Sequence, residues 1–307
     1  MMGYIYLCIA LVSGAIKGFC GKKTSSLTST FYHSVLANLI RMSFCIIIGF
    51  AVVCSEGNFN LLLPDADVLL ITLISGISTA VFVVSWLVSV RQNAYMLMDV
   101  FLMLGVLVPL TLGQLLFNEA VRPVQWLGLG ILFAATLIMC SYNNSIKTKL
   151  TFPAFSLLLL CGFSSGVADF AQKLFTKTSD APVSVFNLYT YIFTALTLVL
   201  VFSLSTKDVA KNRNDSFKRA FPYILVMAIC LFLNSYYKTL AAFYLPSVIL
   251  YPLNHHSFPI HSSADGHLGC FHVLAIINSA VMNTVVHVSL SVLVSSVCMP
   301  GSGNAGS

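Results

Sequence analysis

Four ionisable side chains lie inside long apolar stretches of this sequence: Lys17, Asp99, Asp169 and Lys238. An ionisable group in a membrane interior is costly unless it is paired or reaches water, so each one is a candidate for a substrate-binding or proton-carrying site. Lys17 and Asp169 carry opposite charges. We expect them to form an ion pair across a cavity while it is empty, and a charged substrate or a proton to displace this pair.

These residues also have plainer structural explanations. Lys17 can extend to the membrane interface, and Asp169 can pair with Lys173 one helical turn later. Asp99 can carry a proton for coupled transport, or it can lie hydrated among the lipid headgroups. Arg41 also falls in an apolar stretch, and we expect it to make a structural ion pair or to extend to the interface.

Aromatic residues near these charges are candidates for the wall of a binding cavity. Trp86 lies deeper in its apolar stretch than a tryptophan of the interfacial belt, so we expect it to line the substrate site. Tyr236 and Tyr237 directly precede Lys238. The two tyrosines either belong to the interfacial belt or face the cavity together with Lys238. Trp126, by contrast, falls where a belt residue belongs.

The composition identifies a membrane protein. The chain has 307 residues, of which 58% are hydrophobic and 8% charged, and its mean hydropathy is +0.90. Soluble domains have about 25% charged residues, so this deficit excludes them and predicts a polytopic protein in a lipid bilayer. The net charge of +6 then sets orientation and does not indicate nucleic acid binding. Nine cysteines without a CxxC pair indicate neither a disulfide framework nor a zinc site. We expect no cofactor, and the sequence leaves open whether the chain forms a homodimer.

Long apolar segments predict eight transmembrane helices, because each is near the roughly 20 residues that a helix needs to cross a bilayer. A helix also satisfies its own backbone hydrogen bonds, which lipid requires. We divide the chain into residues 1–143, 150–254 and 255–307, the last with one candidate span at 268–299. The eight predicted spans are 3–20, 34–53, 68–90, 94–117, 124–140, 152–175, 183–204 and 221–243.

Basic residues are distributed unevenly between alternate loops. The loops after the first, third, fifth and seventh predicted spans hold ten Lys and Arg residues, whereas the other loops hold Arg122, Lys173 and Lys177. Because basic loops remain in the cytoplasm, this bias predicts a multi-pass protein of the cell membrane whose N-terminus lies outside.

The sequence contains an internal repeat. The segment SGAIK at 13–17, in the first predicted span, matches SGVAD at 165–169, in the sixth, 152 positions later. Each segment precedes a similar series of spans. Because five is an odd number, two units of five spans would lie in opposite orientations in the bilayer. This arrangement is common in secondary transporters, whose substrate site lies at the midplane between the two units.

The predicted spans at 94–117 and 124–140 form a hairpin with a distinctive turn. The turn reads NEAVRP at 118–123 and continues as QW at 125–126 and GLG at 128–130. This pattern resembles the signature of the EamA-type drug/metabolite transporter superfamily. The resemblance extends over roughly residues 4–254 and includes the number of spans and the short loops.

The resemblance implies an all-α transporter of ten helices in two inverted five-helix halves, in which the first, third and fourth helices of each half line a central cavity. The partners are then a small-molecule substrate and the bilayer. Glu119 accepts hydrogen bonds from free N–H groups at the start of the next helix. The structural turn contains Glu119, Pro123, Gly128 and Gly130. The expected substrate and proton pathway contains Lys17, Trp86, Asp99, Asp169, Tyr236, Tyr237 and Lys238.

Two features depart from the family pattern. The fourth predicted span has Gly105 and Pro109 in place of a proline near its middle. After Asn254 the hairpin is not repeated, so that the last two helices of the second half are degraded or altered. Six of the seven histidines lie beyond this point, and no Lys or Arg follows Lys238. We interpret the change as an out-of-frame read or an aberrant terminus.

These observations leave two functions to weigh. The first is a secondary transporter that moves a small organic metabolite or drug-like solute by alternating access. The alternative is a non-transporting membrane protein, either a remnant or a scaffold, because the closing hairpin is missing. The histidines match no metal-ligand spacing and the sequence has no HExxH motif, so we expect neither a metal site nor an enzyme.

Overall fold

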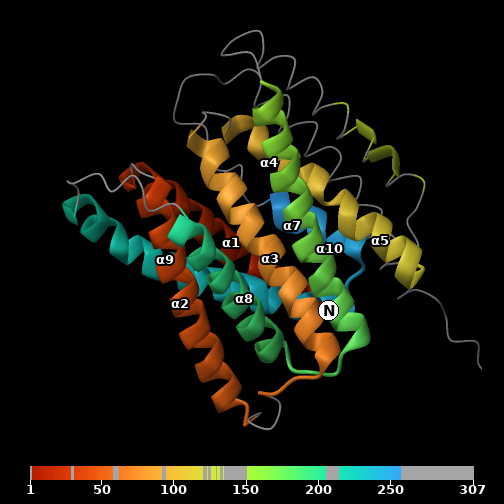
Figure 1. Cartoon of the computed structure of the whole chain (residues 1–307). Helices are drawn as coiled ribbons and strands as arrows, with labels where there is room; N and C mark the ends of the chain where they lie inside the picture. Colours follow the sequence, from red (N-terminus) through yellow and green to blue (C-terminus); the bar gives the residue numbers. More distant parts are fainter. Residues whose placement is uncertain are drawn as a thin grey trace, which may run out of the picture.

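The computed structural model describes residues 2–28, 31–57, 62–91, 95–119, 123, 126–128, 130–131, 134, 151–204 and 214–256. Within these residues the chain is helical, and six helices are long and apolar enough to cross a membrane. The helices are α1 (Met2–Leu27), α2 (Phe31–Ser55), α3 (Ala66–Arg91), α4 (Tyr95–Gly105), α5 (Leu107–Phe117), α7 (Phe152–Thr178), α8 (Val183–Leu204), α9 (Asn214–Tyr244) and α10 (Ser247–His256) (Figure 1).

Six of the predicted spans are confirmed as long apolar helices, namely α1, α2, α3, α7, α8 and α9. α8 has the predicted limits, whereas the other five helices extend beyond theirs because residues at their ends continue the helical backbone. α7, for example, continues to Thr178, so that Lys173 and Lys177 lie in the helix and not in a loop. Most of the predicted span at 124–140 and the whole tail from 257 to 307 lie outside the described residues.

The predicted fourth span is not one continuous helix. It is divided at Val106 into α4 and α5, neither of which is long enough to cross a bilayer alone. Pro109 has no N–H to donate to the carbonyl of Gly105, and a proline ring opposes a continuous helix at this place. The N–H of Val106 instead donates to the carbonyl of Met103, at 3.2 Å, which is the tighter spacing of a 3₁₀ turn.

Helices that are distant in the sequence pack side by side. α1 packs along α9, and α3 packs along α7 (Figure 1). α2 contacts both α8 and α9, and α3 also contacts α8. The described helices α1 to α5 and α7 to α10 therefore form one helical bundle.

Glycines allow α4 and α7 to approach closely. A Cβ atom added at Gly105 would overlap the carbonyl of Gly162, and one added at Gly162 would overlap the carbonyl of Phe101. Gly166 meets the carbonyl of Gly105 in the same way. Small residues at such contacts are characteristic of helices that associate within membranes, because backbones can then pack without intervening side chains.

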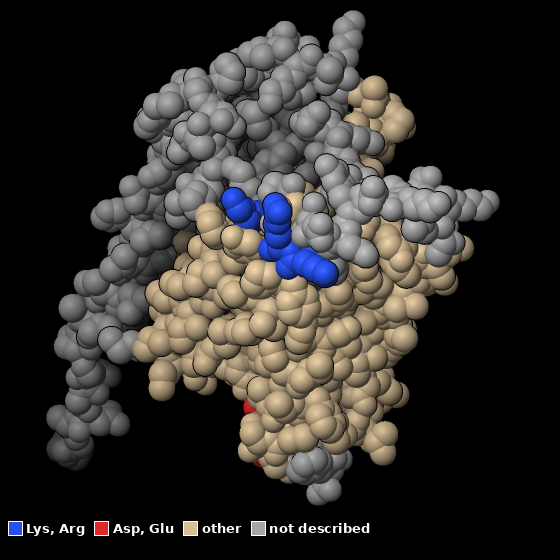
Figure 2. Space-filling model, turned by 90° about the vertical axis from the view of Figure 1, so that its left-hand side faces the viewer, with Lys and Arg blue, Asp and Glu red and all other residues tan. Residues whose placement is uncertain are grey.

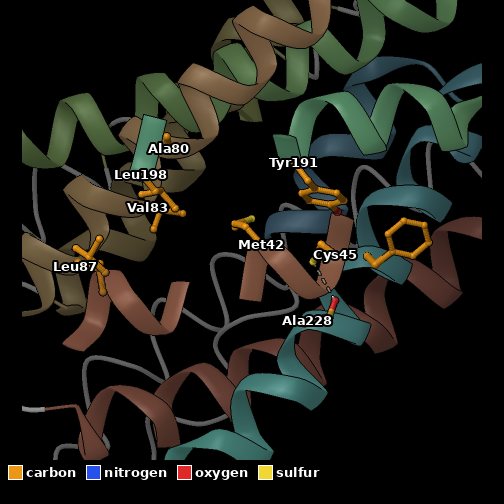
Figure 3. Packing of buried hydrophobic residues seen from close by; sticks show 10 residues of the cluster. Met42, Cys45, Ala80, Val83, Leu87, Tyr191, Leu198 and Ala228 are labelled. Carbon is orange, nitrogen blue, oxygen red and sulfur yellow. Dashed lines mark hydrogen bonds between the residues drawn. The ribbon is translucent and has the colours of Figure 1, made fainter. Parts of the chain in front are cut away.

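A hydrophobic cluster joins α2, α3, α8 and α9 (Figure 3). Its centre contains Met42, Val83 and Tyr191, which are almost fully buried. The thiol of Cys45 donates to the carbonyl of Ala228 on α9, at 3.4 Å, and so links α2 to α9. This cluster positions the helices that carry the candidate site.

Most exposed charges of the described residues separate between the two ends of the bundle, with Lys177, at the end of α7, as an exception. Lys23, near the end of α1, and Lys218 and Arg219, near the start of α9, form a basic end, part of which Figure 2 shows. Asp65 and Asp67, near the start of α3, are exposed at the opposite end. We call these the basic end and the acidic end. The basic end corresponds to the loops that the charge distribution of the sequence predicts to be cytoplasmic.

Candidate functional site

A cavity of about 210 Å³ lies among the helices of both parts of the chain. Residues of α1, α3, α4, α7, α9 and α10 line it, as the family resemblance implies, but residues of α2 and α8 do so as well. Its polar lining residues are Lys17, Thr24, Ser25, Thr28, Ser34, Asn38, Arg41, Ser75, Thr79, Ser165, Asp169, Gln172, Thr190, Tyr191, Asn234, Ser235, Lys238 and Asn254.

Asp169 lies on the cavity wall and forms an ion pair with Lys238. The ammonium of Lys238 is 2.7 Å from the carboxylate of Asp169, and both side chains are largely buried. Sequence reasoning predicted Lys17 or Lys173 as the partner of Asp169, and neither prediction named Lys238. The actual partner is 69 residues away on α9, which packs against α7. The plainer explanation, a pair of Asp169 with Lys173, is wrong because the ammonium of Lys173 pairs with the carboxylate of Glu119.

Lys17 reaches the same cavity from α1. Its ammonium donates to the Oδ1 atom of Asn234, at 3.4 Å. The amide nitrogen of Asn234 donates in turn to the carbonyl of Ala10, at 2.7 Å, and to Oδ1 of Asn254, at 3.3 Å. Gly14 leaves room for this amide, because a Cβ atom there would lie 3.1 Å from its nitrogen. Lys17 therefore belongs to a polar network inside the bundle and does not extend to the interface.

Arg41 is a cavity residue that sequence reasoning assigned to a structural role. Its Nη1 atom donates to the sulfur of Met227, at 3.6 Å, and its buried Nε atom has no hydrogen-bond partner. Within the described part of the chain Arg41 forms no ion pair, so the expected structural pair is not observed. The available signal was its position in the middle of a span, where an arginine is costly without a function.

Several buried polar atoms at the cavity have no hydrogen-bond partner. Besides Nε of Arg41, they are Oγ1 of Thr24, Oε1 of Gln172 and Oγ1 of Thr190. Most buried polar atoms in native proteins are hydrogen-bonded. These four come from α1, α2, α7 and α8 and all line the cavity, so the site offers both donors and acceptors to a polar solute.

Of the predicted aromatic residues, Trp86 lines the cavity and the two tyrosines do not. Three consecutive residues cannot share one face, because each residue turns a helix by about 100°. Lys238 faces the cavity, whereas Tyr236 donates to the carboxylate of Glu56, at 3.0 Å, and Tyr237 contacts the ring of Tyr6. The expectation that all three face the cavity is therefore wrong.

The side chain of Asp99 lies outside the described residues, although its backbone belongs to α4. The turn residues Pro123, Gly128 and Gly130 are described individually, and nothing lies within 4 Å of a Cβ atom added at Gly130. Trp126 is 40% exposed, as a residue of the interfacial belt would be. The structural turn remains a prediction for the parts of 120–140 that are not described.

Glu119 has a structural role, but its partners differ from those that we expected. Its carboxylate pairs with the buried ammonium of Lys173, at 2.9 Å, and accepts the N–H of Ser247 at the start of α10, also at 2.9 Å. Burial opposes the charge of Glu119, but these contacts outweigh it and hold the pKa of the carboxyl below its ordinary value of 4.5. Glu119 thus caps a helix that begins 128 residues later, not the helix that follows its own turn.

The acidic end of the bundle is closed by contacts between the two parts of the chain. The carboxylate of Glu56, after α2, accepts hydrogen bonds from Ser184 on α8 and Tyr236 on α9. The rings of Phe175 and Phe186 stack with their centroids 4.4 Å apart. Phe186 also lines the cavity, so this stack separates the cavity from the acidic end.

Within the described residues, no group of three His, Cys, Asp or Glu side chains could hold a metal ion. The fold and the cavity define a multi-pass helical membrane protein with a charged internal site. In comparisons with known proteins, no family model matches the chain, and no curated protein matches it significantly.

Proposed function

We propose that this chain is a secondary transporter of the EamA-type drug/metabolite class that moves a small organic solute across the cell membrane by alternating access. The observation that carries this proposal is the charged internal cavity, which helices from both parts of the chain line together. A site between two halves, at mid-depth in the bilayer, is typical of secondary transporters.

The positions of the helices support two inverted repeats. α1, α2, α3 and α4 start at residues 2, 31, 66 and 95, and α7, α8, α9 and α10 start at residues 152, 183, 214 and 247. Each start therefore recurs 148 to 152 residues later, which agrees with the 152-residue offset of the SGAIK and SGVAD segments.

The packing supports the same repeat. If α1, α2, α3 and α4 are exchanged with α7, α8, α9 and α10, the contact of α1 with α9 becomes the contact of α7 with α3. In the same way, the contact of α3 with α8 becomes that of α9 with α2, and the contact of α4 with α7 becomes that of α10 with α1. A pseudo-two-fold axis in the membrane plane would produce these matched contacts.

Pathway residues follow the repeat as well. Lys17 and Asp169 are 152 positions apart, and so are Trp86 and Lys238. All four line the cavity. The two halves therefore contribute equivalent positions with different side chains. The helix arrangement is pseudo-symmetric, but the side chains that line the cavity are not.

The cavity extends toward the basic end of the bundle, whereas contacts close the acidic end, and this asymmetry supports alternating access. Apart from Ser75, the lining residues on α1, α2 and α3 lie in the halves of these helices that lead to the basic end, for example Thr24, Ser34 and Leu87. The acidic end is held shut by the Glu56 contacts and the Phe175–Phe186 stack. A transporter that binds its solute from one side at a time needs such a closed end, and breaking these contacts is the step that would expose the site to the other side.

Counterflow in proteoliposomes tests the proposal. The purified full chain is reconstituted, loaded with an unlabelled metabolite and assayed for uptake of the same labelled compound, across a panel of anionic, cationic and neutral solutes. We expect saturable, protein-dependent uptake of at least one solute class. A folded protein that exchanges none of these solutes would favour the alternative, a non-transporting remnant or scaffold.

A further inference from the structure

We propose that the cavity binds a small organic anion, whose carboxylate or phosphate lies between the guanidinium of Arg41 and the ammonium of Lys17. This inference rests on the proposed transport function for the biological role of the site, although binding can be measured without transport.

The first argument is the charge of the cavity. The described residues that line it carry three cationic side chains, Lys17, Arg41 and Lys238, and one carboxylate, Asp169. Lys238 and Asp169 form a pair at 2.7 Å and nearly neutralise each other. Counted by residue type, the described lining therefore has three basic side chains against one carboxylate. An incoming cation would meet this charge in a low-dielectric interior, whereas an anion would be attracted by it.

The second argument is the bonding state of Arg41. Its Nη1 atom has only the sulfur of Met227 as a partner, and its buried Nε atom has none. A thioether is a weak acceptor. A planar guanidinium donates best to the two oxygens of a carboxylate or phosphate, and these charge-assisted bonds are about twice as strong as neutral ones. An oxyanion is the ligand that satisfies this side chain.

The third argument concerns the rest of the solute. Oε1 of Gln172 is a buried acceptor without a partner, and the hydroxyls of Thr24 and Thr190 can donate or accept. These groups match hydroxyl or amino groups on the solute. A cavity of about 210 Å³ has room for a small organic solute, such as a short hydroxylated acid or a small sugar phosphate.

The test measures binding by the purified full chain in detergent, by its melting temperature at constant ionic strength. The anionic probes are succinate and glucose 6-phosphate, the cationic probe is choline, and the neutral probe is glucose. We expect at least one anion to raise the melting temperature in a saturable way, and choline and glucose to leave it unchanged. Arg41→Gln should weaken the apparent affinity for that anion at least tenfold. The matched control is Lys218→Gln, which removes a positive charge at the exposed basic end and should bind as the wild type does.

Lys17→Gln provides a second variant in case Arg41→Gln does not fold, and it should also weaken anion binding at least tenfold. The inference is overturned if neither anion binds, if choline or glucose binds in their place, or if both variants keep wild-type affinity for the anion. Anion binding without counterflow would overturn the proposed transport function and leave the anion site standing. Counterflow of a neutral or cationic solute alone would support the proposed transport function and overturn the anion site.

Discussion

The ammonium of Lys238 on α9 lies 2.7 Å from the carboxylate of Asp169 on α7, inside a cavity that several helices line. The hydroxyl of Tyr251 on α10 donates to the backbone carbonyl of Asp169, at 2.8 Å, and fixes the helix at the same point. The ion pair therefore joins α7 and α9 at the site itself. Any solute that enters the cavity meets a pair that is already formed and buried.

Removal of one partner of this pair should be more destabilising than removal of both. Asp169→Asn leaves the Lys238 ammonium buried without its carboxylate, and we expect the free energy of unfolding to fall by about 3 kcal/mol. In the double variant Asp169→Asn, Lys238→Met no charge remains unpaired, so much of this loss should be recovered. Denaturation in detergent of the wild type, the two single variants and the double variant gives the coupling energy.

The coupling should be at least about 1 kcal/mol for residues that share a buried contact. Strictly additive losses would show that the two side chains do not stabilise each other in the folded protein. Lys218→Met serves as the control, because it removes an exposed lysine from the same helix.

A second prediction concerns the close approach of α4 and α7. A methyl group at Gly105 or Gly162 would overlap a backbone carbonyl of the opposite helix, and rigid backbone must then shift. We expect Gly105→Ala and Gly162→Ala each to lower the free energy of unfolding by about 1–3 kcal/mol. Gly130→Ala is the matched control, because nothing lies within 4 Å of the added atom, and it should be neutral or slightly stabilising. Equal stability of all three variants would contradict the contact.

Much of the fold could be predicted from the sequence, because a membrane helix is specified by a local property, the length of an apolar run. This property identified α1, α2, α3, α7, α8 and α9. The break between α4 and α5 was not predicted, although Gly105 and Pro109 were noticed. Its cause depends on packing as well, since the carbonyl that Pro109 leaves without a donor faces Gly166 on α7.

The site was predicted less completely, because partners in a bundle are distant in the sequence. The cost of a buried charge pointed correctly to Lys17, Asp169 and Lys238 as residues of the interior. It could not say which residues pair, and the choice between Lys238 and Lys173 for Asp169 depends on which face of α7 meets α9. Arg41 carried the same signal and was nevertheless assigned a structural pair that the described residues do not provide.

A third prediction uses the lowered pKa of Glu119. Its folded-state pKa lies below the ordinary value of 4.5, so the carboxylate stabilises the protein above that pH, and this contribution is lost as the pH falls through the folded-state pKa. Glu119→Gln should therefore lower the melting temperature at neutral pH, where the Lys173 ammonium loses its carboxylate partner. The difference between wild type and variant should shrink steadily below about pH 4.5.

The measurement is a series of thermal melts of both proteins in detergent between neutral and acidic pH. Asp67→Asn, which removes an exposed carboxylate at the same end of the bundle, controls for the loss of negative charge. A difference between Glu119→Gln and wild type that stays constant down to the lowest pH would show that the charge of Glu119 is not the source of its stabilising effect.

The last prediction addresses the closed acidic end. The carboxylate of Glu56, after α2, and the hydroxyl of Ser184, on α8, are in hydrogen-bonding contact across the two parts of the chain. If transport requires this end to open, a short reversible thiol cross-linker between Glu56→Cys and Ser184→Cys should hold it shut. We expect counterflow by the double variant to fall to background after cross-linking and to return after reduction.

The two single variants, which retain all native cysteines, show whether the reagent acts elsewhere. Undiminished counterflow by a fully cross-linked protein would mean that the acidic end does not open during transport, and alternating access through this end would then be wrong. The cross-link is at one end of the bundle, and the cavity lining extends toward the other end. We therefore expect the cross-linked protein still to bind its solute in detergent. This binding measurement distinguishes a blocked transport step from a damaged binding site.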